Sequence, residues 1–149
     1  MDQLIAKAAT LLEALPYVQR FRGETFVTKY GGSFMDSDDQ DTRSGVARDI
    51  VFLEAVGINP VVVHGGGKAI TKALAESGVE TRFEHGYRVT TPESVKVVEQ
   101  VLSHEVNPGI VRMINELGGT ARGFSGKNIF RCVPFRPLGQ AGEPLVAAY

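Results

Sequence analysis

The chain reads TFVTKYGG at residues 25–32 and PVVVHGGG at residues 60–67. In both stretches a run of β-branched or aromatic residues leads directly into a glycine-rich turn, and such runs are typical of β-strands. Parallel strands in an open α/β sheet place these turns side by side, at the edge where ligands bind. Glycine lets backbone N–H groups approach an anion closely, and the following helix adds the positive end of its dipole. The repeated arrangement therefore predicts an α/β protein that binds phosphate.

The composition is that of an ordinary globular protein, and 149 residues are enough for one domain with a sizeable core. The formal net charge of −1 gives no basic excess that would point to nucleic acid. The single Cys132 excludes an internal disulfide framework and a multi-cysteine metal site. No apolar run reaches the ~20 residues of a membrane span, and the first residues lack the pattern of a secretory signal. We therefore expect a cytoplasmic protein that binds neither nucleic acid nor membranes.

The first segment carries apolar residues at helical spacing from residue 4 to residue 15. This spacing predicts an amphipathic helix that Pro16 ends or kinks. A helix outside the strand–helix alternation has two uses for its apolar stripe. It packs back on its own domain, or it offers the stripe to another subunit.

Strands and helices alternate through the first half of the chain. A helix with apolar residues at positions 46, 50, 53 and 56 is expected to end at Gly57, and a helix after the second glycine turn is expected to end at Gly78. This order predicts a parallel sheet with right-handed crossovers. The acidic run at residues 36–41 lacks a calcium-loop pattern, so we interpret it as a helix start.

The second half departs from this alternation. Residues 79–89 mix β-forming residues around Gly86 and predict a hairpin or a lid. Helix starts are expected at Thr91-Pro92 and at Asn107-Pro108, with the second helix ending at Gly118-Gly119. The remaining expectations are a third strand at 120–124, a return at 129–133 and a connector at 134–144.

Lys29 and the glycines around it are the first candidate site residues. An ammonium at the mouth of a strand meets the negative charge of a transferring phosphoryl group, while Gly31 and Gly32 supply backbone donors. A solvated lysine at a strand end is the alternative for Lys29. The glycines at 65–67 each cost about 1 kcal/mol of backbone entropy relative to alanine, so a tight turn or a ligand must compensate. The turn does not have the P-loop spacing.

The other polar candidates leave two interpretations open. His64 is a general base or a residue that shapes the turn through hydrogen bonds. Arg88 pairs with a substrate carboxylate or with an acidic surface residue. Ser125-Gly126-Lys127 is a polar turn or a solvated loop. His85 and His104 show no metal-ligand spacing, so no metal site is predicted.

Four motifs together resemble the N-acetylglutamate kinases of the amino acid kinase superfamily. They are FVTKYGG at 26–32, GINPVVVHGGG at 57–67, GYRVT at 86–90 and GFSGK at 123–127. The resemblance implies a three-layer αβα sandwich with a mainly parallel central sheet, of which this chain holds the N-terminal part. It also implies phosphorylation of the side-chain carboxylate of N-acetyl-L-glutamate by ATP with Mg²⁺, in arginine biosynthesis.

The resemblance assigns roles to particular residues. Lys29 matches the lysine that stabilises the phosphoryl transition state, and Gly31 and Gly32 match the turn that faces the phosphate. Gly66 and Gly67 match glycines that contact the acyl substrate. Arg88 matches the arginine that binds a substrate carboxylate. These roles agree with the chemistry of phosphoryl transfer, which depends on positioning and charge neutralisation.

The resemblance also implies a division of the chain. Residues 1–16 correspond to an N-terminal oligomerisation helix, which in arginine-inhibited members links dimers into a hexamer, so L-arginine is an expected inhibitor of the full-length enzyme. Residues 17–149 correspond to the lobe that binds the acyl amino acid, and the nucleotide-binding lobe is absent. We therefore expect a catalytically incomplete kinase. The alternatives are a non-catalytic binding or assembly module and an amino acid kinase for another acidic substrate.

Overall fold

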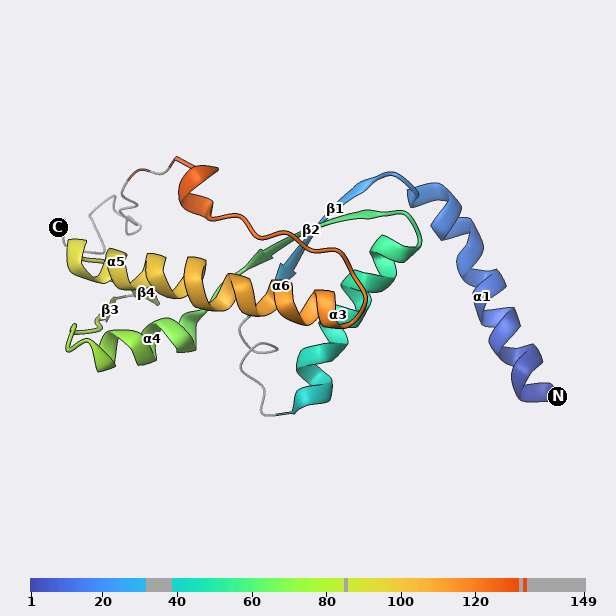
Figure 1. The fold of residues 1–149 in the computed structure, drawn as a ribbon, viewed down its shortest axis with the longest axis horizontal. Helices are drawn as coiled ribbons and strands as arrows, with labels where there is room; N and C mark the ends of the chain where they lie inside the picture. Colours follow the sequence, from blue (N-terminus) through green and yellow to red (C-terminus); the bar gives the residue numbers. More distant parts are fainter. Residues whose placement is uncertain (32–38, 85, 132, 134–149) are drawn as a thin grey trace, which may run out of the picture. The chain divides into compact units, whose positions relative to one another are not determined.

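A computed structural model describes residues 1–31, 39–84, 86–131 and 133 of the chain (Figure 1). The chain forms two compact units. The first unit holds Met1–His64 and Arg112–Ala121, and the second holds Gly65–Val111 and Arg122–Tyr149. The chain passes between them after His64 and again within one long helical segment.

The first unit is built on a parallel pair of strands. Strand β1, Thr25–Tyr30, pairs with β2, Asn59–His64, in a register in which Tyr30 faces His64. Helix α3, Gln40–Ala55, connects the two strands and packs against β2. The buried apolar residues of this unit are Tyr30, Ala47, Ile50, Ile58 and Ile114. The predicted α/β class with a parallel sheet is confirmed, whereas the three layers of the sandwich stay a prediction.

Helix α3 begins where the acidic run was expected to start a helix. The Asp39 carboxylate accepts hydrogen bonds from the backbone N–H groups of Asp41 and Thr42, so it caps the helix. Residues 36–38 of the acidic run lie outside the described residues. Gly57 follows the helix with a φ of +86°, a conformation that favours glycine.

Helix α1, Asp2–Phe21, continues through Pro16, so of the two expectations for this residue the helix end was wrong and the kink stays a prediction. The last turn is anchored beyond the proline. The Phe21 ring lies 5.3 Å from that of Phe26, and the Gly23 N–H donates to the Gly57 carbonyl at 2.7 Å. These contacts hold the end of the helix to the strand region that follows it. No residue of α1 is buried.

The second unit begins with helix α4, Gly67–Glu76, which Gly78 follows with a φ of +67°. Strands β3, Phe83–Glu84, and β4, Tyr87–Arg88, pair antiparallel on either side of Gly86. The predicted hairpin is therefore confirmed. The core of the unit joins α4 to the following helix through Ile70, Leu74 and Val101.

One continuous helical segment spans residues 92–116. It comprises α5 (Pro92–Gln100), a π-helical turn η1 (Val101–Val106) and α6 (Asn107–Glu116). Thr91 and Ser94 form a capping box at its start, as the Thr91-Pro92 signal predicted. Helix α6 begins at Asn107, where the Asn107-Pro108 signal predicted a helix start, but it continues directly from η1, because Asn107 itself has helical backbone angles. The π turn interrupts the regular hydrogen-bond ladder just before Pro108, where the missing N–H costs least.

The third strand expected at 120–124 was wrong, since these residues have no regular secondary structure. Two backbone N–H groups that a strand would use for pairing instead donate hydrogen bonds to side chains. The Thr120 N–H donates to a Glu54 carboxylate oxygen at 3.0 Å, and the Ala121 N–H donates to Asn115 Oδ1 at 2.7 Å. A 3-10 turn, η2, follows at Gly126–Asn128. The described residues of 129–133 form no returning strand, and the connector at 134–144 lies outside the described residues.

Candidate substrate and phosphate site

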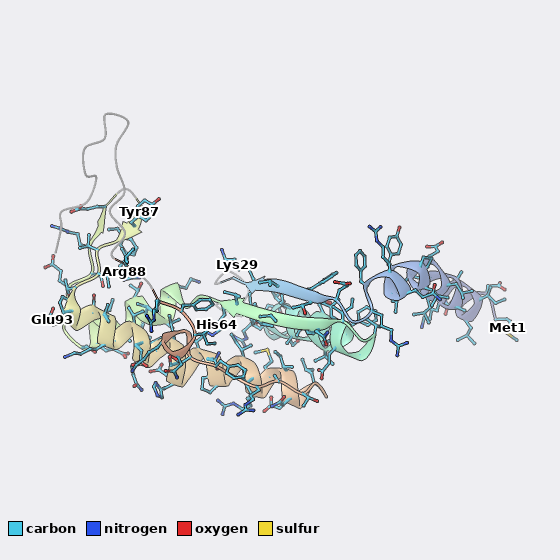
Figure 2. All side chains as sticks on the ribbon, turned by 90° about the horizontal axis from the view of Figure 1, so that it is seen from above. Met1, Lys29, His64, Tyr87, Arg88 and Glu93 are labelled. Carbon is cyan, nitrogen blue, oxygen red and sulfur yellow. The ribbon has the colours of Figure 1, made fainter. Side chains whose placement is uncertain are left out.

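The first candidate region is the carboxyl edge of the parallel strands. Tyr30 and His64 end β1 and β2 in register, so both glycine turns leave the sheet from the same edge. Lys29 is exposed near the end of β1 (Figure 2). A Cβ added to Gly31 would meet nothing within 4 Å, which leaves room for an anion at this backbone. Gly32 lies outside the described residues.

Tyr30 holds the end of β1 in place, a role that sequence reasoning missed. Its ring is fully buried, and its hydroxyl donates a hydrogen bond of 2.9 Å to the Arg43 carbonyl on α3. Burial raises the pKa of the Tyr30 hydroxyl, and the positive charge of Arg43 partly opposes this rise. The strand end that carries Lys29 is therefore tied to the helix that follows it.

The second glycine turn has two different kinds of glycine. Gly66 is buried, and a Cβ on it would lie 2.9 Å from Leu102 Cδ2 and 3.3 Å from Val106 Cγ2. Gly67 is exposed, and a Cβ on it would meet nothing within 4 Å. Packing against the π turn thus accounts for glycine at 66. At 67, glycine leaves the first turn of α4 open to a ligand.

Arg88 reaches from the hairpin to the first turn of α4. Its Nη2 donates to Thr71 Oγ1 at 2.8 Å and lies 3.5 Å from the Gly67 carbonyl oxygen. Its guanidinium carbon sits 4.6 Å from the centre of the Phe83 ring, a cation–π distance. Figure 2 shows Arg88 beside Tyr87 on the hairpin. These contacts, made among the described residues, are with a carbonyl, a hydroxyl and an aromatic ring. They therefore do not support a surface ion pair, the alternative use of Arg88.

The other terminal nitrogen of Arg88, Nη1, is buried and has no hydrogen-bond partner among the described residues. A buried guanidinium donor without a partner is costly unless a ligand completes it. Beside it, the N-cap residue of α4 is Gly66, which has no side chain, so the first N–H groups of the helix are not satisfied by a capping side chain. A positive group next to an uncapped helix N-terminus is suited to a carboxylate.

The predicted site residues fall into two groups. Gly66, Gly67 and Arg88 lie together in the second unit, whereas Lys29 and Gly31 belong to the first. Sequence reasoning missed Thr71 and Phe83, which hold Arg88. The signals were present, because residue 71 lies one helical turn after Gly67, and residue 83 faces residue 88 across a short hairpin.

Other candidates have different surroundings. His64 is half-buried at the end of β2, and its role as a base stays a prediction. The Ser125 hydroxyl lies 2.9 Å from that of Ser103, and Lys127 lies 3.7 Å from Glu99, so the loop of the GFSGK motif rests on the long helical segment. Within the described ranges, no three His, Cys, Asp or Glu residues are grouped to hold a metal ion. No helix in this part of the chain is long and apolar enough to cross a membrane.

Acetylglutamate kinases are among the proteins most similar in sequence. The enzyme of Akkermansia muciniphila is 48% identical over 145 residues, which cover 97% of this chain and 48% of that protein. The enzyme of Jannaschia sp. is 51% identical over 143 residues, covering 94% and 50%. The chain therefore spans about half the length of the curated relatives it matches.

Solved structures of N-acetylglutamate synthase from Neisseria gonorrhoeae are similar in fold. The complex with coenzyme A and N-acetyl-glutamate gives a TM-score of 0.60 at 26% identity, over 74% of this chain and 25% of that one. The complex with coenzyme A and L-arginine gives 0.53 at 25% identity, over 89% and 28%. The model of the amino acid kinase family matches residues 24–136, a range that includes both glycine turns and the hairpin that carries Arg88. This chain therefore belongs to the amino acid kinase family.

Proposed function

We propose that residues 17–149 form the acyl-amino-acid-binding lobe of an N-acetylglutamate kinase of arginine biosynthesis. The observation that carries this proposal is the buried Nη1 of Arg88, which has no hydrogen-bond partner among the described residues and lies beside the uncapped start of α4. Both features favour a carboxylate, and N-acetyl-L-glutamate carries two. The sequence identity of 48% and 51% to two acetylglutamate kinases supports this choice of substrate.

The two carboxylates of the substrate have different tasks. The side-chain carboxylate attacks the γ-phosphorus of ATP, so a new oxygen–phosphorus bond forms and ADP leaves. This carboxylate needs a free lone pair, whereas one held by a guanidinium loses nucleophilicity. We therefore assign Arg88 to the carboxylate that does not react, with Gly66 and Gly67 shaping the turn beside it. This positioning supplies part of the catalysis, since phosphoryl transfer depends on orientation.

Lys29 is assigned to the phosphoryl group. Its exposed ammonium near the end of β1 neutralises charge on the transferring phosphate, and the open backbone at Gly31, continued by Gly32, adds N–H donors. These residues fit the phosphates of ATP. Within the described residues, no three His, Cys, Asp or Glu side chains are grouped to hold a metal ion. The metal is therefore assigned no ligand in this part of the chain.

The second candidate function is a non-catalytic binding or assembly module. It is favoured by the similarity to a synthase complexed with N-acetyl-glutamate, where a related fold occurs in a protein of another activity. Turnover distinguishes the two functions. ADP release by the purified chain at the rate of an intact enzyme, abolished by Lys29→Ala, contradicts the incomplete-site interpretation.

Helix α1 is proposed as the oligomerisation element. Its apolar side chains Leu4, Ile5, Leu11 and Leu12 are all exposed, so one face of the helix is not covered by the part of the chain that the structure describes. We propose that residues 1–16 join dimers into a hexamer, that L-arginine inhibits the full-length enzyme, and that the protein is cytoplasmic. Light scattering of the chain without residues 1–16 tests the first point. An unchanged assembly size contradicts it.

Calorimetric titration with N-acetyl-L-glutamate tests the binding function. Arg88→Met is expected to weaken binding by about 10- to 100-fold, because one or two charge-assisted hydrogen bonds are lost. Arg82→Met is the matched control, since Arg82 lies on the same hairpin and pairs with Glu84 at 2.8 Å. Equal affinities of the Arg88 and Arg82 variants refute the assignment. Titrations with aspartate and glutamate test for another acidic substrate.

A further inference from the structure

Arg88 is held by two residues that have no role in the proposed reaction itself. We propose that Thr71 and Phe83 are positioning residues, which lock the Arg88 guanidinium in the one orientation that leaves Nη1 free for the substrate carboxylate. This inference rests on the proposed function for the identity of the ligand. The brace formed by Thr71, Phe83 and Arg88 is defined by contacts within the second unit alone.

The Thr71 hydroxyl has a fixed polarity. Its oxygen lies 2.8 Å from the Gly67 carbonyl oxygen, which only accepts, so the single hydroxyl proton is directed there. The hydroxyl oxygen is then left as an acceptor, and Nη2 of Arg88 donates to it at 2.8 Å. The two hydrogen bonds therefore run in one direction, with Arg88 donating to Thr71 and Thr71 donating to the Gly67 carbonyl. It ties the guanidinium to the first turn of α4, where the ligand is expected.

Phe83 contacts the same guanidinium from the opposite strand of the hairpin. It faces Arg88 in the β3–β4 register, and its ring centre lies 4.6 Å from the guanidinium carbon. The guanidinium carbon lies over the ring, and Thr71 accepts a hydrogen bond from Nη2. Nη1 is the nitrogen that remains without a protein partner among the described residues. A donor preset in this way binds a carboxylate without first losing rotational freedom.

The brace also predicts that a lysine is a poor substitute at this position. A lysine has a single nitrogen, so it has no second nitrogen to bond Thr71 while another stays free for the ligand. Selectivity for a carboxylate over an amide follows from the same geometry. Nη1 is charged and buried, so a neutral amide oxygen satisfies it less well than a carboxylate does.

The test uses Thr71→Val, which keeps the side-chain shape but removes the hydroxyl, and Thr71→Ser, which keeps the hydroxyl. Arginine side-chain resonances of the ligand-free chain are measured by ¹⁵N–¹H NMR, with Arg88→Lys to assign the signals. We expect separate, slowly rotating Nη signals of Arg88 in the wild type and in Thr71→Ser, and averaged signals in Thr71→Val. Identical Arg88 signals in wild type and Thr71→Val overturn the proposal.

Ligand titrations supply the second readout. Thr71→Val is expected to bind N-acetyl-L-glutamate about tenfold more weakly, and Thr71→Ser within about twofold of wild type. Binding of the analogue whose α-carboxylate is an amide is expected to be unchanged by Thr71→Val, which a merely structural defect would not produce. If the wild type binds neither compound, the proposed function fails, while the NMR comparison still decides whether Thr71 holds Arg88. Phe83→Leu is expected to average the Arg88 signals as well, and unaltered signals would remove Phe83 from the brace.

Discussion

Replacing Gly66 by alanine is expected to destabilise the second unit, because the new methyl group has no space. Its Cβ would lie 2.9 Å from Leu102 Cδ2 and 3.3 Å from Val106 Cγ2, whereas ordinary contact begins at 3.4 Å. The Leu102 methyl must therefore retreat by about 0.5 Å, against a core that is close-packed. Overpacking of this kind costs about 1–2 kcal/mol when a side chain is able to give way. For a chain of this size, that loss lowers Tm by about 2–8 °C.

The matched control is Gly67→Ala, one residue along the same turn. A Cβ there would meet nothing within 4 Å, and alanine favours the helix that begins at this residue. Urea unfolding followed by circular dichroism should therefore place Gly66→Ala below the wild type and Gly67→Ala at or above it. Leu102→Ala should reduce the cost of Gly66→Ala by removing the obstructing methyl group. Equal stability of the two alanine variants would refute the packing explanation for Gly66.

Two further sites test the fold. Tyr30→Phe should cost about 0.5–1.5 kcal/mol in urea unfolding, because the Arg43 carbonyl loses its buried donor, while Tyr17→Phe, at an exposed position, should cost nothing measurable. Burial raises the pKa of Tyr30 above its ordinary value of 10.0, so its stabilising contribution is complete below pH 10 and is lost as pH rises through the folded-state pKa. The free energy of unfolding of Tyr30→Phe should lack this decrease at alkaline pH. An equally steep decrease in the wild type and in Tyr30→Phe would contradict it. Thr91→Val should lower the free energy of unfolding by about 1 kcal/mol, because the Ser94 N–H loses its capping hydroxyl. Thr91→Ser keeps this hydroxyl and should be as stable as the wild type. Thermal unfolding of both variants tests this, and equal stability of the two would contradict the capping role.

Local signals in the sequence were sufficient for much of the architecture. The β-branched runs predicted both parallel strands, and the capping residues predicted the starts of α3 and α5, because these preferences depend on neighbours within a few residues. The predictions failed where a distant contact decided the outcome. Residues 120–124 have strand-forming character, but Glu54 and Asn115 take two of their amides.

Similar reasoning applies to the two proline signals, where the helical backbone is continuous. Pro16 does not end α1, and α6 begins at Asn107 as expected but follows η1 without a break. At Pro16, the contacts of Phe21 and Gly23 secure the turn beyond the proline. At Pro108, the π turn has already widened the ladder before the missing donor.

The sequence by itself determined the strand–turn–helix units, the hairpin around Gly86 and the candidate residues Lys29, Gly31, Gly32, Gly66, Gly67 and Arg88, because residue type and spacing encode these features locally. The tertiary structure alone decided how the candidates differ. It separated Gly66, which packing requires, from Gly67, which stays open, and it showed that Thr71 and Phe83 leave one nitrogen of Arg88 without a partner among the described residues. The physical reason is that hydrogen-bond satisfaction and side-chain crowding depend on residues that only folding brings together.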